Sequence, residues 1–183
     1  MGAFHDAAGI YRQTETGYID LPLAGAGAFT SEDQPTFGYS LVNSEAFGIR
    51  WNNHGTPGAW GTSFRAPSDR KPGTDLTVHI RCSKSGATVG DAVTFTLGAF
   101  NNVVGSLHDA DATFGGATNA LVGDATAKTV SELTRALASA DLVDGATVTL
   151  SVKPTDGTLG TDDVTMHNIF ITYEKVINVG FED

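Results

Sequence analysis

Five histidines are the side chains best suited to metal or acid–base chemistry, but their spacing matches no known site. His5, His54, His79, His108 and His167 are far apart, and none belongs to an HxH, HExxH or mixed Cys/His ligand pattern. A histidine outside such a pattern more often makes structural hydrogen bonds. We therefore predict that His79 and His167, which fall within expected strands, are exposed or hydrogen-bonded structural residues.

Two short acidic segments could supply oxygen ligands to calcium. They are HDAD at residues 108–111 and TDD at residues 161–163. Neither has the remaining ligand positions of an EF-hand loop, and aspartate in turns more often bonds to the local backbone. The sequence therefore favours turns over a calcium site, and we expect no metal.

Signatures of nucleophilic, phosphate-binding and dinucleotide-binding sites are missing from the sequence. No GxSxG, GxxxxGK[ST] or GxGxxG occurs. The single cysteine, Cys82, alternates with Leu76, Val78 and Ile80, which indicates a small buried apolar residue and not a reactive thiol. Carboxylates such as Asp20 show no pairing that would indicate a glycosidase. We predict a protein that is not an enzyme and needs no cofactor.

Three aromatic residues could form a platform for sugar rings. Trp51 continues the apolar face of an expected strand over 45–51, so we place it in the core. Trp60 is flanked by glycines and is expected to be more open. Tyr39 and Trp60 are therefore the candidates for exposed aromatic contacts with a ligand.

Alternating apolar and polar side chains predict the elements that carry these residues. The stretch Asp75–Phe100 reads as strand, turn and strand, because Leu76, Val78, Ile80 and Cys82 share one face, as do Val93, Phe95, Leu97 and Ala99. Residues 129–142 suit either a strand or a helix, and their strand neighbours favour a strand. The sequence also predicts strands over residues 17–23, 45–51, 59–67, 146–154 and 164–176, the last apolar on both faces and therefore central or at an interface.

Many short strands separated by turn residues, with no long helix, predict an all-β fold. We expect an antiparallel two-sheet β-sandwich, jelly-roll-like, with a barrel as the alternative. Residues 1–16 have mixed polarity and no sustained period, so we predict an irregular N-terminal arm. The expected division is an arm over 1–16 and a single β-sandwich domain over 17–183.

Charge and composition limit the partners. The chain has 183 residues, a formal net charge of −10 and no cluster of lysine or arginine, so we expect no nucleic-acid binding. No run approaches the apolar length of a membrane span, and the N-terminus lacks a secretory pattern, so we expect neither membrane insertion nor secretion.

From about Gly17 onward, a series of segments resembles small β-sandwich head proteins of tailed bacteriophages. The series is GYIDLPL, a strand ending in IRW, a loop with FRAPSDRKPG, then DLTVHIRCSKSGAT, ELTRALASADLVDGATVTLSVKP and GTDDVTMHNIFITYEK. The resemblance implies a capsid decoration, or cement, protein that is made in the host cytoplasm and binds the outside of the phage head. It implies the major capsid protein as partner, a homotrimer as the assembly, and no catalytic residues.

Isolated apolar side chains in the polar arm would suit such an interface. We predict capsid or oligomer contacts by Phe4, Ile10, Tyr11 and Tyr18. Two alternatives remain open: a carbohydrate-binding β-sandwich module that uses Tyr39 and Trp60, and a component of the phage tail or baseplate.

Overall fold

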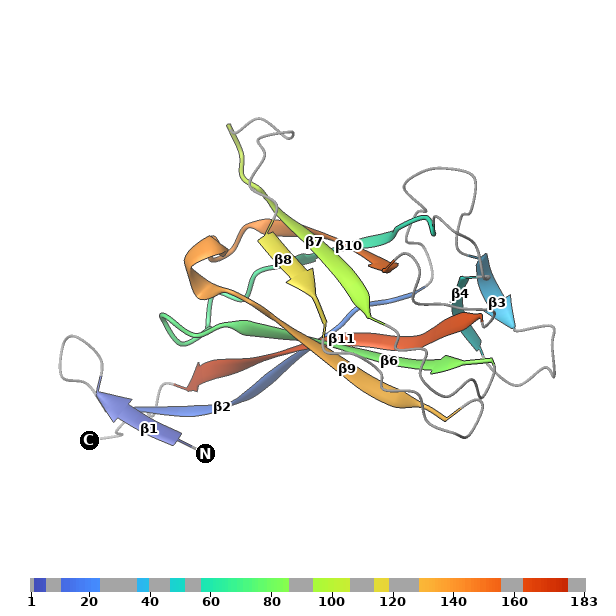
Figure 1. The fold of residues 1–183 in the computed structure, drawn as a ribbon. Coiled ribbons are helices and arrows are strands. Elements are labelled where there is room, and N and C mark those ends of the chain that lie inside the picture. Colours follow the sequence, from blue (N-terminus) through green and yellow to red (C-terminus); the bar gives the residue numbers. More distant parts are fainter. Residues whose placement is uncertain are drawn as a thin grey trace.

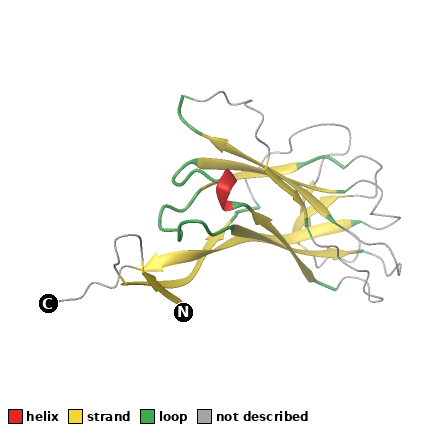
Figure 2. Cartoon of the chain, turned by 60° about the vertical axis from the view of Figure 1, so that its left-hand side comes forward, coloured by secondary structure: helices red, strands yellow, loops and turns green. Residues whose placement is uncertain are grey.

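A computed structural model describes residues 2–5, 11–23, 36–39, 47–51, 57–85, 94–105, 114–118, 129–155 and 163–177. Within these ranges the chain forms two antiparallel sheets that face each other, which confirms the predicted β-sandwich (Figures 1 and 2). In chain order the elements are β1 (Gly2–His5), β2 (Tyr11–Asp20), β3 (Thr36–Tyr39), β4 (Phe47–Trp51), β5 (Trp60–Arg65), β6 (Leu76–Lys84), β7 (Phe95–Asn102), β8 (Phe114–Ala117), β9 (Ser131–Leu137), the 3₁₀ turn η1 (Ser139–Asp141), β10 (Thr147–Pro154) and β11 (Val164–Ile177).

The larger sheet has seven strands, and β11 lies at its centre. On one side β11 pairs with β6, and β6 pairs with β9. The other side of β11 is shared, because β2 pairs with residues 170–177 and β4 with residues 164–166. The outer strands are β9, next to β6, and β1 and β3, next to β2 and β4. The central position expected for residues 164–176 is confirmed.

The smaller sheet has four strands in the order β5, β10, β7, β8, and the core lies between the two sheets. Trp51 of the larger sheet meets Phe95 of the smaller one edge-on, with ring centroids 5.6 Å apart. The Trp51 side chain is 1% exposed and its indole N–H donates to the carbonyl of Gly58 at 2.8 Å. Trp51 is therefore a core residue, as predicted.

Strand alternation explains which side chains enter this core. In β6, Leu76, Val78, Ile80 and Cys82 are fully buried, whereas the residues between Leu76 and Cys82 point to the opposite face. Burial raises the pKa of the Cys82 thiol to about 12, because the thiolate would lose its hydration. Cys82 is thus a core residue and not a nucleophile.

The ambiguous segment 129–142 contains the strand β9 followed by the single turn η1, so the preference for a strand is confirmed. Leu133 and Leu137 are buried at a spacing that a helix would also allow. Pairing with β6, from Leu76 opposite Leu137 to Cys82 opposite Ser131, decides in favour of the strand.

The N-terminal segment differs from the prediction. Within the expected arm, Gly2–His5 form β1 and residues 11–16 belong to β2, which continues across the expected boundary after residue 16, so these parts are strands and not irregular. Residues 1 and 6–10 lie outside the described residues. Backbone pairing of Gln13–Asp20 with Phe170–Ile177 orders the segment despite its weak apolar pattern. The resulting hairpin, with the end of β11, extends beyond the two-layered body (Figure 1).

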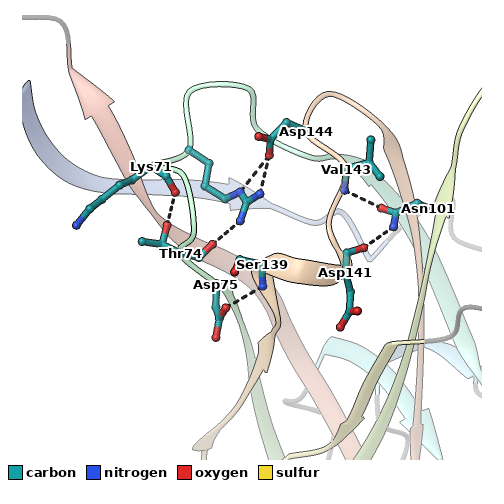
Figure 3. Close-up of polar contacts among 9 residues, drawn as sticks. Lys71, Thr74, Asp75, Asn101, Ser139, Asp141, Val143 and Asp144 are labelled. Carbon is teal, nitrogen blue, oxygen red and sulfur yellow. Dashed lines mark hydrogen bonds and ion pairs between the residues drawn. The ribbon is translucent and has the colours of Figure 1, made fainter. Parts of the chain in front are cut away.

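Polar contacts hold together the loops at one end of the sandwich (Figure 3). The buried guanidinium of Arg70 donates to one carboxylate oxygen of Asp144 at 3.2 and 2.7 Å and to the carbonyl of Thr74. The side chain of Asn101 bonds to the backbone of Asp141 and Val143. The Arg70 contacts fix the loop between β5 and β6 against the turn before β10, and the Asn101 contacts join β7 to the segment between η1 and β10.

Candidate functional site

The aromatic platform predicted from Tyr39 and Trp60 is not supported at Trp60. Trp60 is 1% exposed, so its predicted exposure is wrong. It pairs with Val152, a core residue of β10, and cross-strand partners point to the same side of a sheet. Flanking glycines indicated an open position, but strand register turned the ring inward. The backbone of Tyr39 lies in β3, and its side chain lies outside the described residues.

The outer face of the larger sheet gathers polar and aromatic side chains instead. Strand register places Tyr18, Thr172 and Thr77 in one row across β2, β11 and β6. The next row contains Asp20, Phe170, His79 and Thr134. We call this surface the outer face, and its described members at the centre are Thr16, Tyr18, Asp20, Thr77, His79, Arg81, Glu132, Thr134, Asn168, Phe170, Thr172 and Glu174.

Tyr18 is the most accessible aromatic ring of the described face. Its side chain is 66% exposed, although it belongs to a paired strand inside the sheet. The two residues on either side along the same face of β2, Thr16 and Asp20, are also exposed. Tyr18 therefore presents an accessible aromatic surface bordered by polar groups.

His79 anchors a polar cluster beside Tyr18. Its ring is stacked on Phe170, with centroids 4.6 Å apart and planes inclined by 6°. Nδ1 lies 2.8 Å from a carboxylate oxygen of Glu132, and Nε2 lies 2.9 Å from the hydroxyl of Thr172. The prediction that His79 is a hydrogen-bonded histidine is confirmed.

Arg81 completes this cluster. Its guanidinium lies 5.1 Å from the centre of the Phe170 ring, and its Nε donates to Glu132 at 3.0 Å. The hydrogen bonds from His79, and then those from Arg81, lower the pKa of the Glu132 carboxyl. The carboxylate therefore holds both donors in place, and the cluster offers hydrogen-bonding groups in fixed positions.

A depression of about 390 Å³ lies at the hairpin end of the same face. Phe4 from β1 contributes to it, and the Lys71 ammonium lies 5.3 Å from the centre of its ring. Phe4 therefore makes contacts within the chain. Of the other predicted interface residues, Tyr18 is exposed. The backbone of Tyr11 lies in β2, but its side chain is outside the described residues, and so is the whole of Ile10. The depression is lined by Phe4, Arg12, Ser68, Asp69, Arg70, Pro72 and Val176.

The remaining predicted groups have structural partners where they are described. The Ser83 hydroxyl lies 2.8 Å from His167 Nε2, so that histidine is hydrogen-bonded as predicted. Asp163 forms an ion pair with Arg50, and the rest of the TDD segment and the HDAD segment lie outside the described residues. The described part of the chain contains no group of three or more histidine, cysteine, aspartate or glutamate side chains that could hold a metal. It also contains no helix long and apolar enough to span a bilayer.

Sequence reasoning missed Phe170, Arg81 and Glu132 as members of one site. In its own strand, each of these residues is adjacent to a residue that faces the core. Strand alternation therefore identifies it as facing outward. The sequence does not reveal that β6 lies between β9 and β11. The three side chains come together only because of this strand order.

The comparisons with known proteins show the fold. No family model and no curated protein matches the sequence. A structure of the CBM22-1 and GH10 modules of Clostridium thermocellum xylanase 10B, complexed with xylohexaose, is similar with a TM-score of 0.51 at 13% identity. The similarity covers 92% of this chain and 29% of that structure.

Two further structures have lower scores. A xylan-binding module, CBM15, has a TM-score of 0.49 at 14% identity, covering 87% of this chain and 97% of the module. The CBM36-1 domain of a multidomain xylanase from the hindgut metagenome of Trinervitermes trinervoides has a TM-score of 0.48 at 9% identity, covering 91% of this chain and all of that domain. At these identities the shared feature is the β-sandwich.

Proposed function

We propose that this chain is a non-catalytic carbohydrate-binding β-sandwich module that holds a glycan against the outer face of the larger sheet. The observation that carries the proposal is the exposure of Tyr18, a residue 66% accessible in the middle of a hydrogen-bonding surface. A fold shared with a xylanase fragment that was crystallised with xylohexaose supports this choice of ligand class.

The chemistry of the outer face suits a sugar. A pyranose ring has an apolar face of C–H groups and a rim of hydroxyls, so it needs a flat aromatic surface beside groups that donate and accept hydrogen bonds. Tyr18 supplies the flat aromatic surface, and Asp20 and Thr172 are its polar neighbours. On the neighbouring strands β6 and β9, Arg81 and Glu132 add a donor and an acceptor that already hold each other in position.

The length of the outer face favours an oligosaccharide. Along one strand, residues on the same face are about 7 Å apart, so the distance from Val176 to Phe170 is about 20 Å. The strand register thus gives a distance of about 20 Å along β11 between the depression and the row of His79, a length that suits several sugar units.

Titration calorimetry with xylohexaose, cellohexaose and mannohexaose tests the proposal. We expect the wild-type protein to bind at least one of them. Replacing Tyr18 with alanine is expected to weaken that binding about three- to tenfold, the range given by loss of one aromatic contact. Val104→Ala is the control, because Val104 is fully exposed and follows β7 in the other sheet. Equal affinities of wild type and Tyr18→Ala would contradict the assigned site.

The predicted role as a capsid decoration protein is a second candidate. The hairpin that extends beyond the sandwich supports it, because an extended strand pair can reach a neighbouring subunit (Figure 1). In this role the chain would bind the major capsid protein as a homotrimer on the surface of the virion. A mass of three chains in solution, with co-sedimentation on empty capsid shells and no glycan binding, would favour this role over the first.

A further inference from the structure

We infer that the glycan carries protonated amino groups, and that the carboxylate of Asp20 selects it. This inference rests on the proposed function and names the chemical class of its ligand. Asp20 is an exposed residue at the end of β2, on the same face as Tyr18 and two residues beyond it. Same-face neighbours on a strand are about 7 Å apart, so a sugar stacked on Tyr18 reaches Asp20 with its own substituents or with those of the next unit.

Asp20 differs from the other described charges around Tyr18. Glu132 is paired with Arg81 at 3.0 Å, and Glu174 with Lys71 at 3.0 Å. Asp20 has no ion pair within the described part of the chain and lies opposite the uncharged Phe170. Counting only residues that the structure describes, the outer face beside Tyr18 therefore has one negative charge, Asp20, without an ion-pair partner.

Among the residues that the structure describes, no cationic group near the Tyr18 ring reverses the charge of Asp20. Arg81 lies over Phe170, but Glu132 neutralises it. Arg12 belongs to the opposite end of β2 and is about 20 Å from Tyr18 along the strand, beyond the screening length at physiological salt. The net charge of −10 adds a weak attraction for cations over the whole surface.

This arrangement of charges predicts an order of affinity for three classes of glycan. An ammonium group near Asp20 gains Coulomb energy, a neutral hydroxyl gains only a hydrogen bond, and a uronate is repelled. At contact distance in water the interaction of two unit charges changes affinity by about fivefold. We therefore expect amino-sugar oligomers to bind most tightly and uronate oligomers most weakly.

The test uses tetrasaccharides that share one β-1,4-linked gluco backbone: a glucosamine oligomer, cellotetraose and a glucuronate oligomer. Affinities are measured by calorimetry in slightly acidic, low-salt buffer, in which aliphatic amines are protonated. In the wild-type protein we expect about fivefold steps from amine to neutral to uronate. Asp20→Asn is expected to remove most of the difference in affinity among the three oligomers.

Asp141→Asn is the matched control, because it makes the same change in net charge at an exposed residue of η1. That variant should keep the wild-type order. Equal affinities for the three oligomers, or an unchanged order in Asp20→Asn, would overturn the inference and leave the proposed function standing if cellotetraose binds. Binding of xylohexaose with no binding of the amine oligomer would also overturn the inference and leave the proposed function standing. Failure of every glycan to bind would overturn both.

Discussion

Replacing Asp144 with asparagine tests whether a buried arginine depends on a carboxylate at the surface. The side chain of Arg70 is 4% exposed, whereas that of Asp144 is 51% exposed. Asparagine keeps an oxygen that can accept hydrogen bonds from Arg70 but removes the negative charge. The guanidinium then remains buried with neutral acceptors only, the substituted side chain and the carbonyl of Thr74.

The size of the effect follows from the geometry. One oxygen of Asp144 accepts from Nε at 3.2 Å and from Nη2 at 2.7 Å. Hydrogen bonds to charged partners contribute about 1 kcal/mol more than neutral ones, and the half-exposed carboxylate is partly screened by water. We expect Asp144→Asn to lower the free energy of unfolding by about 1 kcal/mol. Asp144→Ala also removes the acceptor, and we expect a loss of about 3 kcal/mol.

Differential scanning calorimetry measures both losses. For a domain of this length, 1 kcal/mol corresponds to about 2–4 °C in Tm, so we expect the alanine variant to melt roughly 6–12 °C below wild type. Asp141→Asn is the control, since Asp141 is exposed in η1 and contacts Asn101 through its backbone carbonyl. Melting temperatures for both Asp144 variants within about 1 °C of the control would refute the reasoning.

Two further predictions concern Tyr173. A Cβ on Gly17 would lie 2.3 Å from the ring of Tyr173, so we expect Gly17→Ala to cost about 1–3 kcal/mol in urea unfolding, and less in a Tyr173→Ala background. Burial, and then the hydrogen bond to Asp69, raise the pKa of Tyr173 to about 12. Unfolded tyrosine ionises near pH 10, so this contribution to stability is complete below about pH 10 and is lost as the pH rises towards 12. Urea unfolding across that range should show the loss, and an equal loss in Tyr173→Phe would contradict the assignment.

Strand positions could be predicted from sequence because the core imposes a period of two. Leu76, Val78 and Ile80 alternate with polar residues, and the structure buries all three. Trp51 follows the same rule. The rule also limits the prediction, because it gives the face of each residue within its own strand and says nothing about which strand lies beside it.

Contacts between distant segments account for the errors. The ring of Trp60 is buried because β5 pairs with β10. Residues 13–16 are a strand because β11 is long enough to pair with them, and residues 11 and 12 pair with β1. The cluster of His79 and Glu132 joins residues 53 positions apart. No local pattern encodes such pairings, so the site depends on register and neighbour order that a single sequence does not state.

The central place of β11 has a consequence for synthesis. The ribosome makes β2, β4 and β6 before the strand that all three need as a partner. Until that last strand emerges, these earlier strands have open hydrogen-bonding edges on which a nascent chain can aggregate. Completion of the larger sheet is therefore a late event, dominated by contacts between residues far apart in the chain, and slow folding follows from that topology.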